Sequence, residues 1–231
     1  MSLELSGTTG VKGVAGSVSA PSIVGDDTNT GISFPSADTI KFSTGGVERM
    51  SITNSGVTGI SGGKLLQTVT VSDSVRETSG SISLSSAGTY YATPFTVTIT
   101  PSATSSKILL MGHVMGEFNV NDYVAAWRIN RAISGGTSTG IEGAAAGSRP
   151  RVISVANEAF TSANADSTPT VMTFAGLLDS PSTTSAITYT FQVNSTQSSS
   201  KTFYYNQTVN SSDAIDYERG LSWITAMEVA A

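Results

Sequence analysis

Apolar and polar residues alternate with a period of two in the first sixty-odd residues, in short runs separated by turn-forming residues. Ile40-Lys41-Phe42 and Met50-Ser51-Ile52 show the alternation clearly. Successive side chains of a β-strand point to opposite faces, so this period predicts strands. From residue 64 onward we find no amphipathic helical pattern. The pattern therefore predicts an all-β protein.

The part of the chain after residue 63 is a succession of strand-length segments. Breakers such as Thr100-Pro101-Ser102 and Ser180-Pro181-Ser182 lie between them. Strands at this spacing predict an antiparallel, jelly-roll-like β-sandwich. The expected strands are Lys64–Val71, Ser81–Leu84, Phe95–Thr100, Lys107–Gly116, Tyr123–Ile133, Val152–Glu158, Thr170–Leu178, Ala186–Asn194, Thr202–Gln207 and Leu221–Val229.

For this region the sequence also predicts one strand that is buried on both faces and the position of the longest loop. The apolar run Lys107–Met111 predicts a strand buried on both faces. Residues 134–150, rich in Gly and Ala, form the longest expected loop. Loops of this length are usually functional or disordered.

The composition changes sharply at Gly59–Gly63, which we take as a domain boundary between residues 1–63 and 64–231. The first region holds more than half of the 23 glycines and only two aromatic residues, Phe34 and Phe42. So few large side chains cannot offset the entropy of ordering the segment. Residues 1–63 are either a flexible linker or a shaft that buries its apolar stripe against copies of itself. The regular alternation favours the shaft.

Composition and charge exclude several classes of function. The 231 residues carry a formal net charge of −5, only 13% are charged, and no basic stripe is present. We therefore expect no nucleic-acid partner. No apolar stretch approaches the roughly 18 residues of a membrane span, so we expect no membrane insertion. The chain has no cysteine, which excludes disulfides and thiolate metal sites. The N-terminus lacks the basic and apolar regions of a signal peptide. We expect no cofactor and no metal.

The first region carries a recurring order of short β-prone pieces and turns. The pieces are Ala20-Pro21-Ser22-Ile23, Asp27-Thr28-Asn29-Thr30-Gly31-Ile32, Phe34-Pro35, Ala37-Asp38-Thr39-Ile40 and Thr44-Gly45-Gly46-Val47-Glu48-Arg49-Met50-Ser51-Ile52. This order resembles the shaft-like segments of bacteriophage tail-fibre proteins. The resemblance implies a trimeric β-shaft in which three chains wind together.

The second region has a resemblance of its own, which covers most of residues 64–231. It is carried by Leu65-Leu66-Gln67, Phe95, Ile99-Thr100-Pro101-Ser102, Ser105-Ser106-Lys107-Ile108-Leu109-Leu110, Leu178-Asp179-Ser180-Pro181, Thr183-Thr184-Ser185 and Ile224-Thr225-Ala226-Met227-Glu228. These residues look like a domain at the C-terminal end of many phage tail fibres. The motifs belong to turns and strand edges, so they bear on fold and virion role and not on the ligand.

Together the resemblances imply a homotrimeric fibre protein of the virion. We expect its N-terminal segment to attach to other tail or capsid proteins. We expect its head to bind a bacterial surface glycan without catalysis. Two alternatives stay open. One is a structural virion component (a head fibre, decoration protein or fibre adaptor) that contacts no receptor. The other is a glycan-degrading fibre enzyme, which needs two carboxylates facing each other across a cleft.

The candidate ligand-binding cluster is Phe118, Asn119, Asn121, Asp122 and Tyr123, where aromatic faces alternate with amide and carboxylate groups. Sugar rings stack on aromatic side chains and bond to amides and carboxylates. The same logic applies to Tyr90-Tyr91 and to Tyr204-Tyr205-Asn206. The alternative for all three clusters is packing in the core or at the rim of the sandwich.

The single histidine, His113, lies in an apolar strand segment. It is interpreted as a hydrogen-bonded strand residue or an interface residue. We assign no catalytic residue.

Overall fold

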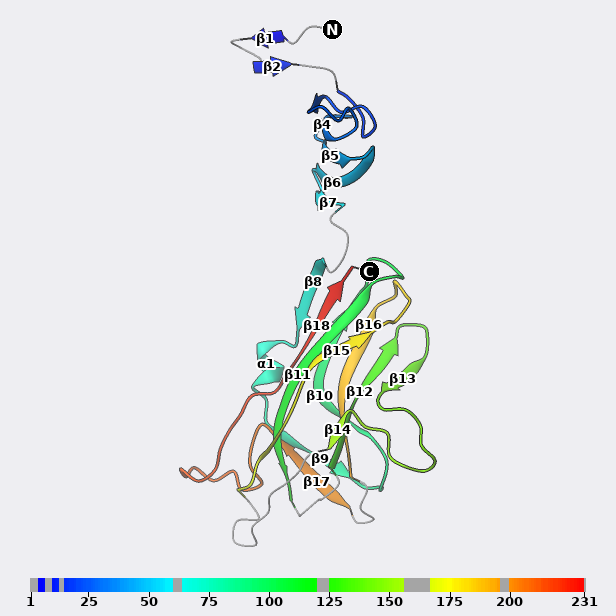
Figure 1. The fold of residues 1–231 in the computed structure, drawn as a ribbon. Coiled ribbons are helices and arrows are strands. Elements are labelled where there is room, and N and C mark those ends of the chain that lie inside the picture. The colour runs from blue at the N-terminus through cyan, green and yellow to red at the C-terminus, as the bar shows by residue number, and fades with distance from the viewer. Residues whose placement is uncertain are drawn as a thin grey trace. The chain divides into compact units, whose positions relative to one another are not determined.

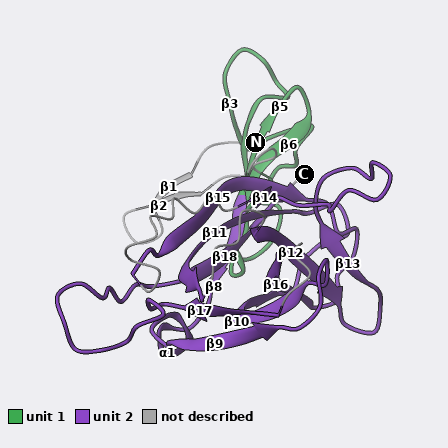
Figure 2. Cartoon of the chain, turned by 90° about the horizontal axis from the view of Figure 1, so that it is seen from below, with its two compact units in different colours: residues 1–64 green, residues 65–231 purple. Residues whose placement is uncertain are grey.

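The computed structural model describes residues 4–6, 10–12, 15–59, 64–119, 125–155, 167–195 and 200–230. The chain forms two compact units, residues 1–64 (unit 1) and 65–231 (unit 2), shown in green and purple in Figure 2. The division lies one residue from the expected boundary. The regular secondary structure of the described residues consists of strands and one four-residue helix, α1 (Asp73–Arg76). The described part holds no helix long and apolar enough to span a membrane.

Unit 1 contains a small antiparallel sheet in which consecutive strands are neighbours. Its strands are β3 (Ile23–Val24), β4 (Gly31–Ser33), β5 (Ile40–Thr44), β6 (Val47–Thr53) and β7 (Gly56–Thr58); β1 (Glu4–Ser6) and β2 (Gly10–Lys12) pair separately. Gly45 and Gly46 form the two-residue turn between β5 and β6 and have φ values of 57° and 73°. Positive φ at both positions is the hairpin geometry that glycine favours, which explains the Gly-Gly pair in the sequence.

Unit 2 consists of two antiparallel sheets with their strands drawn in Figure 1. The first sheet holds β10 (Tyr91–Ile99), β16 (Ile187–Ser195), β12 (Ala125–Ile133), β13 (Ser138–Ile141) and β14 (Ser154–Val155). The second sheet holds β8 (Leu65–Thr70), β18 (Trp223–Val229), β11 (Lys107–Phe118), β15 (Thr170–Asp179), β17 (Lys201–Tyr205) and β9 (Gly80–Leu84).

The strand order of unit 2 is that of a jelly roll. One sheet has the order β10-β16-β12-β13, and the other has β8-β18-β11, with β15 pairing β11 on its far side. From β10 to β12 and from β14 to β17 the chain alternates between the two sheets, and the last strand, β18, pairs with the first, β8. The predicted jelly-roll-like sandwich is confirmed.

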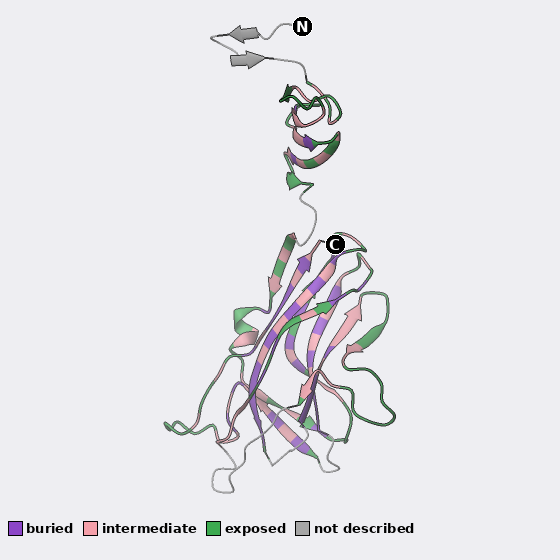
Figure 3. Ribbon diagram, viewed as in Figure 1, coloured by how far each residue is buried: buried purple, intermediate pink, exposed green. Residues whose placement is uncertain are grey.

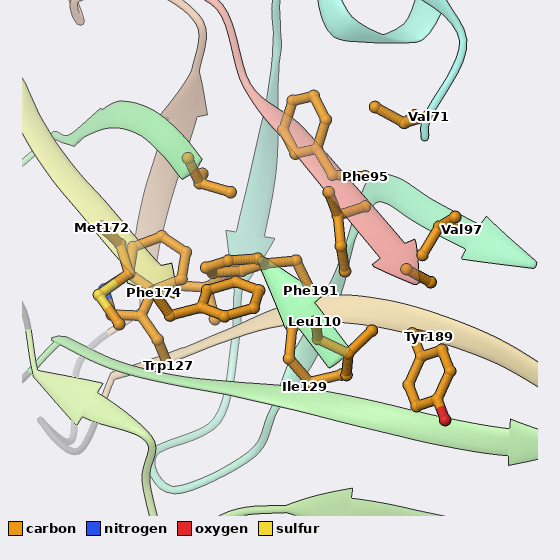
Figure 4. Packing of buried hydrophobic residues seen from close by; sticks show 14 of the residues in the cluster. Val71, Phe95, Val97, Leu110, Trp127, Ile129, Met172, Phe174, Tyr189 and Phe191 are labelled. Carbon is orange, nitrogen blue, oxygen red and sulfur yellow. The ribbon is translucent and has the colours of Figure 1, made fainter. Parts of the chain in front are cut away.

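The core of unit 2 lies between the two sheets and is centred on aromatic side chains (Figure 4). Trp127 of β12 is 1% exposed and packs edge-on against Phe191 and Phe203, at ring-centroid distances of 5.3 and 5.1 Å. Phe174 of β15 packs against Phe191 at 5.5 Å. Both sheets contribute, so these contacts hold one sheet against the other. Along the strands of unit 2, buried residues alternate with half-buried and exposed ones (Figure 3).

Each expected strand after residue 63 has a counterpart, and its described ends differ by up to four residues; residues 123–124 and 156–158 of the expected strands lie outside the described residues. Two sequence expectations were wrong. Part of the expected loop 134–150 is a strand, because Ser138–Ile141 pairs with β12. Lys107–Met111 is buried on one face only, since Leu109 and Met111 are half-exposed on the other. The trimeric state of the shaft stays a prediction.

Candidate functional site

The predicted ligand cluster at residues 118–123 is placed only in part. Phe118 is fully buried and contacts Phe203 in the core at a centroid distance of 5.0 Å. The Asn119 side-chain oxygen accepts a hydrogen bond from the backbone N–H of Thr202 at 2.8 Å. The other members, Asn121, Asp122 and Tyr123, lie outside the described residues. The cluster as a ligand site therefore stays a prediction.

His113 lies on the outer face of β11 and contacts its neighbours in the sheet. Its Nδ1 is 3.0 Å from the Thr173 hydroxyl, and its ring stacks on Trp223 at 6.4 Å. Burial lowers the pKa of His113. Among the described residues, no group of three or more metal-ligating side chains contains it. These contacts fit the interpretation of His113 as a strand residue.

The buried carboxylates hold backbone segments together. Glu117 is fully buried and accepts hydrogen bonds from the N–H groups of Thr168 and Val209 at 2.6 and 2.7 Å. Asp179 is bound by Arg131 and Tyr189, each at 2.8 Å. Such carboxylates are saturated by donors that belong to the fold, so their positions are explained structurally.

One face of the unit 1 sheet carries a cluster of apolar side chains, none of which is fully buried. The strand register places Ile23, Ile32, Phe42 and Met50 in one row across the sheet, and Ile40, Ile52 and Val57 in a second row on the same face. We call these seven residues the unit 1 apolar face. Ile23 and Val57 are 57% and 41% exposed. Phe34, Ile40 and Ile52 also line a hollow of about 400 Å³.

Unit 1 has no hydrophobic core of its own in its described part. The buried side chains among residues 15–59 are three serines, Ser33, Ser43 and Ser51, and Figure 3 accordingly shows little purple there. An antiparallel sheet normally buries one apolar face. In unit 1 alone, five residues of that face are half-buried, and Ile23 and Val57 are exposed.

A second apolar surface lies on the outer face of the larger sheet of unit 2. Cross-strand pairing brings Leu109 beside both Met227 and Leu178, and Met111 lies two residues along the same strand. Leu178 is 58% exposed. Together with Trp223 these residues form the unit 2 apolar face. The outer face of the other sheet is polar instead, with Thr98 bonded to Thr188.

On that polar outer face the structure forms a pocket of about 270 Å³. We call it the arginine pocket; it is lined chiefly by Tyr90, Arg128, Glu142, Arg149, Arg151 and Asn194. Arg128 comes from β12 and Asn194 from β16, at positions that alternate with core residues of their strands. The segment between β13 and β14 supplies Glu142 and both remaining arginines.

The pocket is held by a network of charged and hydrogen-bonded groups. Glu142 accepts a hydrogen bond from Arg128 Nη1 at 2.8 Å and forms an ion pair with Arg151 Nη1 at 3.3 Å. The guanidinium of Arg128 lies 3.9 Å from the Tyr90 ring centre, a cation–π contact. Tyr90 donates its hydroxyl hydrogen to the Arg151 carbonyl at 2.6 Å. Burial raises the pKa of Tyr90, so the hydroxyl stays protonated at neutral pH.

The segment over the pocket is anchored at both of its ends. Gly143 donates its N–H to the Val152 carbonyl at 3.0 Å, and Arg151 Nε donates to the Gly143 carbonyl at 2.8 Å. Backbone and side chain thus hold the pocket wall in a defined place against the sheet.

Asn194 is the unusual member of the pocket. Asn194 is 1% exposed, yet among the described residues neither its amide nitrogen nor its amide oxygen has a hydrogen-bond partner. Buried polar side chains are nearly always paired. An amide offers two donors and an acceptor oxygen, so Asn194 carries unused bonding capacity at the wall of the pocket.

Of the pocket residues, Tyr90 could be singled out from the sequence, and the three arginines and Asn194 could not. Tyr90 was noted as an aromatic residue beside a turn. The three arginines and Glu142 are spread over 24 positions (128–151) and joined by no motif. The one available signal was the concentration of arginine in that stretch of a chain with only 12 basic residues.

Comparison with known proteins adds the following. No protein-family model matches the chain, and no curated protein matches it in sequence. Three solved structures of infectious bursal disease virus are similar in part: the Gt strain (12% identity, TM-score 0.39), the Gx strain (12%, 0.38) and a VP2 subviral particle (12%, 0.28). Each match covers 83% of this chain, and 52%, 48% and 50% of the other.

The chain therefore spans about half the length of the chains that it matches. At TM-scores below 0.5, these structural similarities do not indicate what this chain does.

Proposed function

We propose that the chain is a viral structural protein, a homotrimeric tail-fibre component whose head binds the surface of a host bacterium without catalysis. Unit 1 is the shaft and unit 2 the head. The N-terminal resemblance to fibre shafts motivates the proposal.

The observation that carries the proposal is the unit 1 apolar face, on which no side chain is fully buried in a single chain. Seven apolar side chains lie on one face of a sheet whose buried residues are serines. At about 25 cal/mol per Å² of apolar area, association of such faces is a large favourable term. Copies of the same segment supply a matching surface at the same position of each chain, which favours a closed symmetric assembly.

The unit 2 apolar face supports the same conclusion for the head. In a single chain Leu178 of this face is exposed and Trp223 is half-buried. Contiguous exposed apolar patches mark interaction sites. The polar sheet on the other side carries the arginine pocket and has the composition of a surface that stays in water. A trimer would place three such pockets on one particle, and linked weak sites bind with raised avidity.

The chemistry of the arginine pocket supports binding without catalysis. Its described lining holds one carboxylate, Glu142, and that carboxylate is paired with two arginines. Glycoside hydrolysis requires a second carboxylate facing the first. A binding role makes no such demand.

The test is the mass of the full-length chain in solution, measured by light scattering coupled to size exclusion, followed by binding to a panel of bacterial strains. We expect three times the chain mass of 23.7 kDa and binding to at least one strain. A monomer would refute the shaft and leave residues 1–63 as a linker. A trimer that binds no strain would point to a structural virion component instead.

A further inference from the structure

The arginine pocket has an excess of positive charge. Three guanidinium groups face one carboxylate, whereas the whole chain has a net charge of −5. Arg128 and Arg151 are each bound to Glu142. The side chain of Arg149 has no partner among the described residues, and it lines the same space. A ligand that enters the pocket would therefore meet at least one guanidinium with unused donors, which favours an anionic group.

The fold of the pocket keeps these guanidiniums in place. Arg128 is bound on three sides, by Glu142, by the Gln192 side-chain oxygen at 2.8 Å and by the face of Tyr90. Its position therefore costs little further ordering when a ligand arrives, because a preorganised side chain has already lost its rotamer freedom.

Asn194 supplies the second, independent observation. It comes from a central strand of its sheet, is buried, and leaves its amide unpaired beside the pocket. An unpaired buried amide is destabilising, and a buried apolar side chain would avoid that penalty. A ligand hydroxyl can both donate to the amide oxygen and accept from the amide nitrogen.

The size of the pocket limits the ligand. A volume of about 270 Å³ lies just below the usual range for drug-sized molecules. The pocket therefore fits one small, hydroxyl-rich and negatively charged unit. A sugar residue with an acidic substituent combines these properties, whereas a neutral sugar would leave the Arg149 guanidinium unused.

We propose that the arginine pocket binds an acidic sugar unit of a bacterial surface polysaccharide, with the acidic substituent held by Arg149 and Arg151 and a hydroxyl held by Asn194. This assignment rests on the proposed function, since it names the chemical class that the head would recognise.

The experiment is ligand-observed saturation-transfer NMR on the full chain. The probes are glucuronate and galacturonate, glucose 6-phosphate as a sugar with a phosphate group, and glucose as the neutral comparison. We expect saturation of the acidic sugars and little of glucose. Stronger saturation of the uronates identifies a carboxylate as the preferred group, and stronger saturation of the phosphate sugar identifies a phosphate. No saturation of any acidic sugar beyond that of glucose would overturn the proposal.

Three variants locate the binding. Asn194→Leu and Arg149→Ala should each weaken binding of the acidic sugars by about tenfold, the effect of removing one hydrogen-bonding or charged partner. Arg219→Ala is the control, because Arg219 is exposed outside the pocket and the change in charge is the same. Loss of binding in the control, or unchanged binding in both pocket variants, would refute the site.

Folding of the variants is checked by thermal melting. Asn194→Leu should melt at the same temperature as the parent chain or higher, because its amide has no bond to lose. Failure of the pocket assignment can be distinguished from failure of the proposed function. If the acidic sugars do not bind but the trimer still binds bacterial cells, only the pocket assignment fails. If they bind a monomer that attaches to no cell, the fibre proposal fails instead.

Discussion

Glu228 joins the last strand of unit 2 to the start of the fold. Glu228 is 1% exposed. Oε1 accepts hydrogen bonds from the Ser102 N–H at 2.6 Å and from the hydroxyls of Ser102 and Ser106, each at 2.7 Å. Oε2 accepts from the Gln67 amide nitrogen at 2.6 Å. One carboxylate thus holds β18, β8 and the segment between β10 and β11 together.

The perturbation is Glu228→Gln, which keeps the shape and removes the charge. The glutamine oxygen can still accept the three bonds at Oε1, but a bond to a neutral acceptor contributes about 1 kcal/mol less than one to a charged acceptor. Three weakened bonds give about 3 kcal/mol. The glutamine nitrogen at the Oε2 position cannot accept the Gln67 bond, and its loss adds about 1 kcal/mol. The relief of burying a charge offsets about half of this sum. We expect the free energy of unfolding at pH 7 to fall by about 2 kcal/mol.

The same residue makes a prediction about pH. Burial raises the pKa of Glu228, but hydrogen bonds from Ser102, Ser106 and Gln67 outweigh it and hold the pKa below its ordinary value. A group with a lowered pKa in the folded state stabilises the fold above the unfolded pKa of about 4.3, and this stabilisation is lost as the pH falls through the folded pKa. The gap between parent and Glu228→Gln should therefore be constant above about pH 5 and shrink toward pH 3.

The assay is equilibrium unfolding in urea at pH 7, 5, 4 and 3, followed by tryptophan fluorescence. Both tryptophans, Trp127 and Trp223, lie in unit 2, so the signal reports the unit that contains Glu228. Glu218→Gln is the matched control, since Glu218 is exposed, and it should change stability by less than about 0.5 kcal/mol. Equal stability of parent and Glu228→Gln at pH 7, or a gap independent of pH, would refute the reasoning.

Three further predictions concern the sheets and the units. Gly116→Ala should destabilise unit 2 by about 2 kcal/mol in the same urea assay, because its Cβ would lie 2.2 Å from a carbonyl oxygen of β17; Gly143→Ala, with 3.5 Å available, is the control. Replacing Ile40 and Phe42 by Ser should speed tryptic cleavage within unit 1 by about tenfold, and an unchanged rate would favour the flexible linker. The fragment 65–231 should retain a β-type far-UV circular dichroism spectrum; an unfolded spectrum would mean that unit 2 depends on unit 1.

The local chemistry of the sequence predicted most of the strands of unit 2. The alternation around Phe95–Thr100 and Ala186–Asn194 appears as β10 and β16, because period two reports which side chains can face a core. Ser138–Ile141 was missed, since Ser, Thr and Gly carry no apolar period. Its strand exists through pairing with β12, which is a tertiary contact.

The candidate site was much less accessible to sequence reasoning. Phe118 was assigned to the candidate ligand-binding cluster, and the sheet pairing placed it in the core. Tyr90 was noticed, but its partner Arg128 lies 38 positions away. No sequence pattern near Tyr90 or near Arg128 predicts that the two side chains are in contact.

The sequence by itself determined that this chain is built of β-strands, where most of them lie, and that residues 1–63 carry too few large side chains for a core. These properties follow from the alternation and size of neighbouring side chains. The tertiary structure decided that β8 pairs with β18, which face of each sheet stays uncovered, and that Arg128, Glu142 and Asn194 share one pocket. The reason is physical: strand propensity acts between residues close along the chain, whereas pairing and burial depend on which distant segments the fold brings together.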